Sequence, residues 1–208
     1  HSAKNHGKAC SKINMGVKRI SGGLSGGTIA SMLNMTKQII KDPSLRKELN
    51  NPYSCCPPDH GFTARQVNIT VAYDEHAKSW RAPFMMAAIN TRIVHRSNAL
   101  SGKAYGEQFY YQEATLTGDS KAGEKRAKRM ATGFKLFNFA TAISPIRWLL
   151  ERFVLAKPGE GPSPEEQING EFDLRFRGQT EQGEVVKVKV TGDRDPGYGS
   201  TAKMISQA

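Results

Sequence analysis

Acidic residues and cysteines are scarce in this 208-residue chain. Its 19 aspartates and glutamates are outnumbered by 30 lysines and arginines, which gives a formal net charge of +11. Its three cysteines, two of them adjacent at Cys55 and Cys56, are too few for a disulfide framework. The sequence therefore favours a reducing, cytoplasmic setting.

Long apolar runs are also missing. The longest uncharged, apolar-leaning run in the second half, residues 136–146, contains Pro145 and is too short to cross a bilayer. Residues 1–12 are polar and include no initiating Met, so we expect no signal peptide, and we expect the chain to be a fragment of a longer protein. We expect no transmembrane segment.

Two kinds of cofactor motif are absent as well. No G-x-G-x-x-G fingerprint follows a predicted strand, and no acidic residue lies about 20 positions beyond one, so we expect no nicotinamide cofactor to bind this chain alone. Adjacent cysteines rarely reach one tetrahedral ion together, and no second cysteine pair exists. We therefore expect no metal site.

The patterns that are present predict an α+β domain. Phe172, Leu174 and Phe176 alternate with charged residues, which indicates a half-buried strand with an apolar core face. Strands are predicted near residues 13–20, 66–73, 107–116, 171–177 and 185–190.

Helices are predicted between and after these strands, over residues 28–41, 84–100, 120–142 and 146–155 and after Gly199. Trp80–Pro83 is expected to introduce the second of them, with Pro83 in its first turn. We expect residues 1–208 to form one domain, with a mixed, largely antiparallel sheet and helices packed on one face. The hairpin of the last two strands should be central or next to central.

Two glycine-rich turns precede predicted helices. Ser21–Thr28 contains four glycines, and Gly192–Ser200 is rich in turn residues. Each turn either lets backbone segments pack closely or presents free N–H groups to an anion. On the second account Gly26, Gly27 and Thr28 line a ligand cleft.

Basic residues cluster on the helix predicted over 120–142, and an amphipathic segment, 146–155, follows it. Such a pair can lie on an anionic membrane or track phosphates. We favour the alternative in which the apolar stripes pack on the sheet and the lysines face water.

Four separated stretches carry a family resemblance. SGGLSGGTIASMLN, PFMMAAINTRIVHRSNAL, KPGEGPSPEEQINGEFDLRF and GDRDPGYGSTAKM resemble the saccharopine dehydrogenase-like oxidoreductases, a family that includes the trans-acting enoyl reductases. The resemblance runs from about Val17 to Ala208. It implies that the chain is the substrate-side or dimerisation domain, and that the missing Rossmann domain is its partner and holds NAD or NADP.

The resemblance also suggests a substrate cleft for a small molecule or an acyl or lipid-like substrate, in a fragment that is inactive alone. The substrate-binding candidates, from the glycine turns and the family-like motifs, are Gly26, Gly27, Thr28, Asn90, Arg96, Arg194 and Tyr198. No catalytic residue is assigned, although His95 is the histidine with the most suitable setting. A homodimer is compatible with the resemblance.

A second hypothesis is a non-catalytic basic module that binds an anionic membrane surface or nucleic acid, for which strong salt dependence would be expected. The basic residues lack regularly interleaved aromatics, which disfavours single-strand binding. Peripheral membrane contact remains compatible with the sequence.

Overall fold

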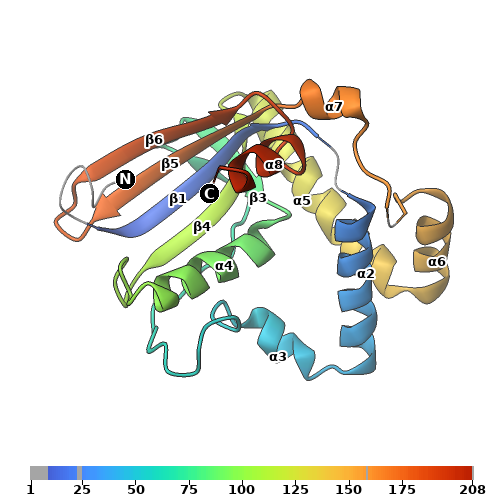
Figure 1. The fold of residues 1–208 in the computed structure, drawn as a ribbon, viewed down its shortest axis with the longest axis horizontal. Helices are drawn as coiled ribbons and strands as arrows, with labels where there is room; N and C mark the ends of the chain where they lie inside the picture. The colour runs from blue at the N-terminus through green and yellow to red at the C-terminus, as the bar shows by residue number, and fades with distance from the viewer. Residues whose placement is uncertain (1–8, 23–24, 158, 208) are drawn as a thin grey trace. The chain divides into compact units, whose positions relative to one another are not determined.

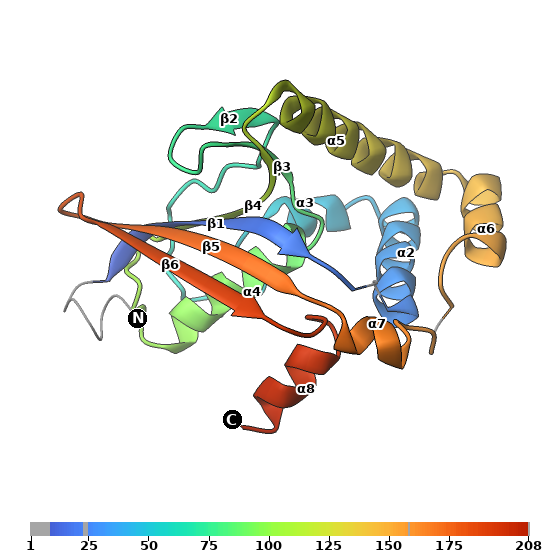
Figure 2. The same ribbon diagram turned by 90° about the horizontal axis from the view of Figure 1, so that it is seen from above.

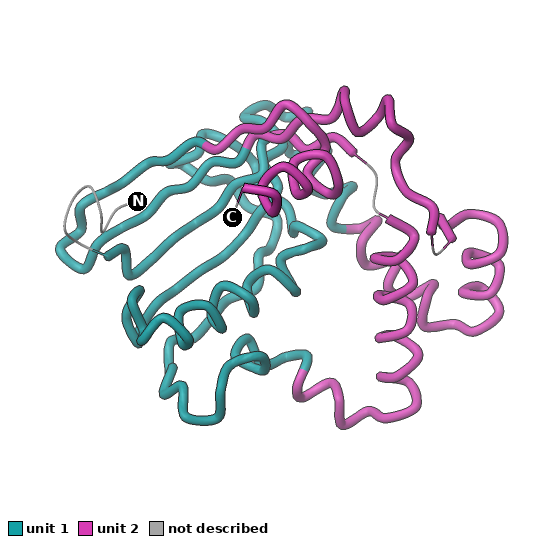
Figure 3. Tube along the Cα trace, in the orientation of Figure 1, with its two compact units in different colours: residues 1–18, 49–131, 174–189 teal, residues 19–48, 132–173, 190–208 magenta. Residues whose placement is uncertain are grey.

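The computed structural model describes residues 9–22, 25–157 and 159–207. The chain divides into two compact units, each built from three segments (Figure 3). Unit 1 contains residues up to 18, 49–131 and 174–189, and unit 2 contains 19–48, 132–173 and from 190 onward. Both units therefore assemble from segments far apart in the sequence.

Within the described residues, six strands form one mixed sheet in the order β2-β3-β4-β1-β5-β6 (Figure 1). β1 runs parallel to β4, whereas β3 is antiparallel to both β2 and β4. The strands are β1 (Cys10–Ile20), β2 (Ala72–Asp74), β3 (Ser79–Pro83), β4 (Tyr110–Gly118), β5 (Phe172–Thr180) and β6 (Val185–Gly192).

Seven helices accompany the sheet in the described part of the chain, which confirms the predicted α+β class. They are α2 (Gly26–Lys41), α3 (Leu45–Asn50), α4 (Ala87–Leu100), α5 (Lys121–Ala142), α6 (Ser144–Phe153), α7 (Pro164–Ile168) and α8 (Gly199–Ile205).

The core of unit 1 lies between the sheet and α4, which runs along one face of the sheet (Figure 1, Figure 2). Its buried centre consists of Met15 and Val17 of β1, Tyr111 of the adjacent strand β4, and Phe109, which directly precedes β4. Leu174 and Phe176 of β5 pack against this centre, as the strand pattern predicted, although both are only partly buried. In unit 2, Phe172 lies against Gly192.

The strand predicted at 66–73 is wrong for residues 66–71, which form no strand. The side chain of Gln66 forms hydrogen bonds to the backbone at the start of β4 instead. Its Oε1 accepts the N–H of Tyr111, and its Nε2 donates to the carbonyl of Phe109. Because one amide side chain holds the segment against β4, its backbone forms no ladder there, and Val67 is exposed.

Two further elements differ from prediction. Trp80–Pro83, expected to introduce the α4 helix, belongs to β3, where Pro83 sits opposite Ala114 at the end of the pairing. A terminal strand position tolerates proline because its missing N–H is not needed by the ladder. The last hairpin has β5 next to the central strand β1, but β6 forms the edge of the sheet.

The favoured packing of the two amphipathic helices against the sheet stays a prediction for α5 and is wrong for α6. On α5, Ala127 and Thr141 of the predicted stripe are fully buried. On α6, Ile146, Leu149 and Phe153 are all exposed, although they lie on one helical face. The apolar stripe of α6 therefore faces solvent.

Candidate functional site

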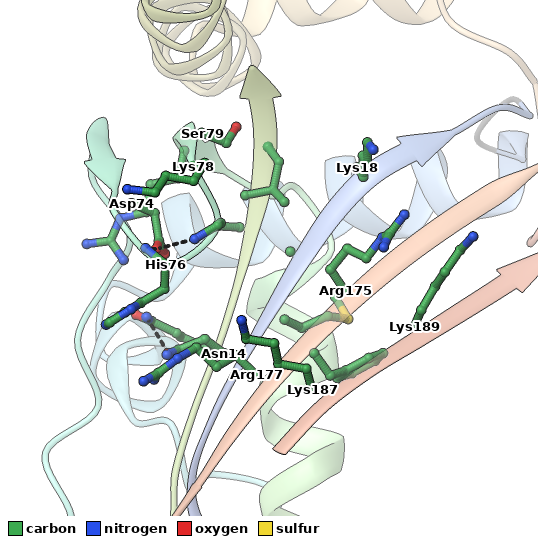
Figure 4. A pocket seen from close by; sticks show the side chains of 18 of the residues that line it. Asn14, Lys18, Asp74, His76, Lys78, Ser79, Arg175, Arg177, Lys187 and Lys189 are labelled. Carbon is green, nitrogen blue, oxygen red and sulfur yellow. Dashed lines mark hydrogen bonds between the residues drawn. The ribbon is translucent and has the colours of Figure 1, made fainter. Parts of the chain in front are cut away.

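A basic hollow of about 520 Å³ lies within unit 1, on the face of the sheet opposite the core (Figure 4). Its position follows from strand alternation. On β1, Met15 and Val17 point into the core, so Asn14, Gly16 and Lys18 line the other face. The core and the hollow thus lie on opposite faces of the same sheet.

Seven basic side chains and two carboxylates line the hollow. Those labelled in Figure 4 extend from β1, β5, β6 and the β2–β3 connection. The basic residues are Lys18, Lys78, Arg81, Arg175, Arg177, Lys187 and Lys189.

The β5–β6 hairpin brings like charges together. Thr180 donates its N–H to the carbonyl of Glu184 at the turn, which sets the antiparallel register. Counting along the hairpin from this bond places Arg177 opposite Lys187, and the next pair on that face is Arg175 and Lys189. Directly opposed like charges destabilise a hairpin, so an anion bound in the hollow would reduce the repulsion between Arg177 and Lys187.

Arg81 also lines the hollow. Its Nε atom is buried and has no hydrogen-bond partner in the described part of the chain. On the rim, Asp74 is already engaged, because its Oδ1 accepts the backbone N–H groups of His76 and Ala77. More cations than carboxylates therefore line the hollow.

Behind the sheet, on the core side, Glu113 forms a buried polar cluster with Asn90 and Tyr111. Its carboxylate accepts a bond of 2.9 Å from Asn90 Nδ2 and another of 2.9 Å from the Tyr111 hydroxyl. Burial raises the pKa of Glu113, and these two hydrogen bonds partly oppose the shift. Burial, and then the nearby Glu113 charge, raises the pKa of Tyr111.

His95 lies in an aromatic enclosure of unit 1. Its ring is 4.9 Å from that of Tyr53 and 5.9 Å from that of Phe109, and Phe62 lies close by. Burial lowers its pKa to about 4, and its Nε2 is buried without a partner in the described residues. At neutral pH this histidine is an uncharged part of the core.

The two predicted site residues of α4 do not line the hollow. Asn90 belongs to the Glu113 cluster, and exposed Arg96 donates from Nη1 to the carbonyl of Cys55 at 2.6 Å. Their predicted substrate-binding role stays a prediction. The structure shows them bonded to other parts of unit 1.

In unit 2, Gly26, Gly27 and Thr28 begin α2. A Cβ on Gly26 would lie only 1.7 Å from the carbonyl oxygen of Lys157, so this glycine permits a close backbone approach. The N–H of Gly26 is donated to the carbonyl of Glu160, and that of Thr28 to Ser25 Oγ. These two N–H groups have partners within the chain.

The turn before α8 is filled by Asp195, which is fully buried. Its carboxylate accepts the N–H groups of Gly197, Tyr198 and Gly199 at 2.9, 2.9 and 2.7 Å. The expectation of free N–H groups here is therefore wrong, because an internal carboxylate already takes the place of a bound anion. Arg194 is exposed beside it.

The two glycine-rich turns do lie side by side in unit 2. A Cβ on Gly22 of the first turn would be 3.0 Å from Asp195 Cβ of the second. Residues 23 and 24 of the first turn lie outside the described residues. The assignment of Gly26, Gly27, Thr28, Arg194 and Tyr198 to a substrate site stays a prediction.

The two glycine turns do not fit a dinucleotide well. Such a ligand needs free N–H groups at a helix N-terminus after a strand, and those of Gly26, Thr28 and Gly197–Gly199 have partners within the chain. No cluster of three potential metal-binding side chains occurs in the part of the chain that the structure describes. None of the described helices is long and apolar enough to cross a membrane.

The basic hollow was missed by sequence reasoning. The alternation of Arg175 and Arg177, and of Lys187 and Lys189, was visible as the polar face of a predicted hairpin. What the sequence did not reveal is that β1 pairs with β4 and lies beside this hairpin, which brings Lys18 and Arg81 to the same face.

Comparison with curated proteins finds relatives named as trans-acting enoyl reductases. One from Mycobacterium tuberculosis is 33% identical over 220 aligned residues, which cover 100% of this chain and 52% of the relative. Relatives from Mycobacterium bovis and Mycobacterium ulcerans are 31% and 32% identical, covering 89% and 88% of the chain and 46% of each relative. No family model matches the chain, and no solved structure matches it significantly.

The chain is thus similar to part of several proteins that are named trans-acting enoyl reductases. The chain spans about half the length of the curated relatives it matches.

Proposed function

We propose that this chain is the substrate-side domain of a nicotinamide-dependent, saccharopine dehydrogenase-like oxidoreductase. NAD or NADP would be held by a nucleotide-binding domain outside these residues. Two observations support this division: the similarity to trans-acting enoyl reductases covers the whole chain but about half of the relative, and the two glycine turns do not fit a dinucleotide well.

The basic hollow carries the proposal about the substrate. Arg177, Lys187 and Arg81 together give the hollow the positive charge to hold an anionic group, and charge-assisted hydrogen bonds to such cations are among the stronger polar contacts. The substrate would be an acyl or other small molecule that bears a negative charge. The hollow would bind and orient this charged end.

The test is steady-state kinetics of the full-length protein with NADH or NADPH and unsaturated acyl thioesters that do or do not carry a phosphate. Replacing both Arg177 and Lys187 by Ala removes two cations and one like-charge contact from the hairpin. We expect KM for the phosphate-bearing substrate to rise by about tenfold or more, because each lost charged contact costs about 1.5–3 kcal/mol, while kcat changes little.

Lys121→Ala is the matched control, since Lys121 is an exposed cation on α5 outside the hollow. The KM of this variant should equal that of the wild type. An unchanged KM in the double variant, or an equal rise for the substrate without phosphate, would show that the hollow does not bind the anionic end.

A further inference from the structure

The outer face of α6 exposes large apolar side chains to solvent. Trp148 and Phe153 are 61% and 68% exposed, and Leu149 is 51% exposed. Ile146, Leu149 and Phe153 recur at helical spacing, so they form one stripe. A stripe of this kind normally packs against a core, and its exposure marks an interaction surface.

The opposite side of α6 is already fixed within unit 2. Glu151 pairs with Lys37 of α2 at 2.7 Å. Arg147 donates to the carbonyl of Thr141 at 2.7 Å and to Ser144 Oγ at 3.1 Å, which ties α6 to the end of α5. The exposed stripe is therefore held outward by contacts on the other side of the helix.

Further large apolar side chains of unit 2 that are close in sequence to α6 are also exposed. Leu136 and Phe139, near the end of α5, are 62% and 67% exposed, and Val154, just after α6, is 68% exposed. We call the exposed apolar side chains of this region the α5–α6 face. They are Leu136, Phe139, Ile146, Trp148, Leu149, Phe153 and Val154.

The charges close in sequence to this face are mostly positive. Residues 132–157 contain four basic residues and one carboxylate, and that carboxylate is Glu151, which the Lys37 ion pair neutralises. Exposed Arg152 lies over the Phe153 ring, 5.7 Å from its centroid. The aliphatic part of an arginine can thus lie along apolar surface while its charge reaches anionic headgroups.

We propose that the α5–α6 face binds the surface of an anionic lipid bilayer. A helix of ten residues is about 15 Å long, which is too short to span a bilayer but long enough to lie in its interface. Tryptophan, leucine and phenylalanine on one side with arginine beside them is the composition of interfacial helices. A protein that binds this face would need an acidic surface to match the basic residues around it, whereas anionic lipid headgroups provide the negative charge directly.

Co-sedimentation with vesicles tests this proposal. The full chain is mixed with vesicles of phosphatidylcholine containing phosphatidylglycerol, and separately with vesicles of phosphatidylcholine alone. We expect clear binding to the anionic vesicles and much weaker binding to the neutral ones. The variant with Trp148→Ser and Phe153→Ser should bind anionic vesicles at least about tenfold more weakly, because it removes two large apolar contacts.

Two controls make the result specific. Val67→Ser changes an apolar side chain that is 57% exposed in unit 1 and should bind like the wild type. Trp148→Phe should keep binding but lose the fluorescence change that accompanies burial of Trp148 in lipid. Circular dichroism of each variant checks that the fold is intact.

Three outcomes would overturn the proposal. These are no binding of the wild type to anionic vesicles, equal binding of the wild type and the double serine variant, or equal loss of binding in Val67→Ser. If sedimentation equilibrium shows that the double serine variant instead abolishes self-association while vesicle binding persists, the face is a contact between copies of the chain.

Discussion

The depressed pKa of His95 makes the stability of the chain depend on pH. Burial favours the neutral imidazole, so the folded-state pKa of about 4 lies below the ordinary value of 6.5. The resulting stability is fully present above the unfolded value and is lost as pH falls toward 4. The cost across this window is about 3 kcal/mol, at 1.36 kcal/mol per pKa unit.

Replacing His95 by Phe should remove this dependence, because a phenyl ring suits the aromatic enclosure and takes up no proton. Urea unfolding at several pH values between 4 and 7 measures it. His76→Ala, at an exposed position, should retain the wild-type slope. An unchanged slope in His95→Phe would mean that this imidazole stays accessible to protons.

Glu113 should act in the opposite direction. Its folded-state pKa is raised above the ordinary 4.5, so the folded chain binds a proton more readily than the unfolded chain does. Its stabilising contribution is greatest at low pH and falls as pH rises from 4.5 through the raised value. Glu113→Gln should therefore gain in unfolding free energy relative to the wild type across that range, as measured by denaturant titration. A constant difference between the two proteins would contradict this.

Sequence analysis singled out His95 and Asn90 but missed Glu113 and the burial of the histidine. The enclosure of His95 comes from Tyr53, Phe62 and Phe109, which lie at sequence separations that no local pattern connects. Strand alternation also places Tyr111 and Glu113 on the same face, but only the pairing of β4 with β1 shows that this face is the core.

The first turn of α2 offers a matched pair of glycines. Gly26→Ala would place a Cβ 1.7 Å from the Lys157 carbonyl oxygen, whereas at Gly27 the nearest atom is Ser25 Oγ at 3.7 Å. We expect Gly26→Ala to lower the unfolding free energy by about 2–3 kcal/mol, because backbone must move. Gly27→Ala should be neutral or stabilising by up to about 1 kcal/mol. Thermal and denaturant unfolding of both variants checks this, and similar effects at the two positions would contradict the close approach.

The Asp195 turn gives a second matched pair. Asp195→Ala would leave three backbone N–H groups without their acceptor, so we expect a loss of about 2–4 kcal/mol in unfolding free energy. Asp193→Ala changes an exposed neighbour and should stay within about 0.5 kcal/mol. If both variants unfold at the same denaturant concentration, the buried carboxylate does not organise this turn.

Elements were predictable where one local pattern decided them. Alternation identified β1, β5 and β6, and apolar spacing identified α2 and α5. The strand prediction failed at residues 66–71, where a glutamine side chain bonds to the neighbouring strand in place of the backbone. At β3 the proline predicted a helix start, but the segment is a strand. The amphipathic pattern predicted the position of helix α6, but it did not show that the apolar side of this helix would be exposed to solvent.

For the molecule as a whole, the isolated chain should bind NADH and NADPH too weakly to measure by calorimetry. The physical reason is that the N–H groups of Gly26, Thr28 and Gly197–Gly199 in its glycine turns have partners within the chain, and the sequence has no dinucleotide fingerprint. Micromolar binding of either cofactor by the wild-type chain would contradict this.

The fold class was predictable from the order of strands and helices, but the order of strands in the sheet was not. The parallel pairing of β1 with β4 joins residues almost a hundred positions apart, as in Lys12 with Tyr110. Nothing in either strand alone specifies the other, because both present the same alternation to every neighbour. The basic hollow depends on this pairing, so it could not be assembled from the sequence.

The edge position of β6 also bears on how the protein behaves at high concentration. An uncovered strand of alternating valines is a template on which further chains can add, and Val185 and Val190 are exposed. Lys187 and Lys189 interrupt that template with two positive charges. A second copy adding to this edge would bring its own lysines alongside them, so the same cations that line the hollow also oppose growth of the sheet into a fibre.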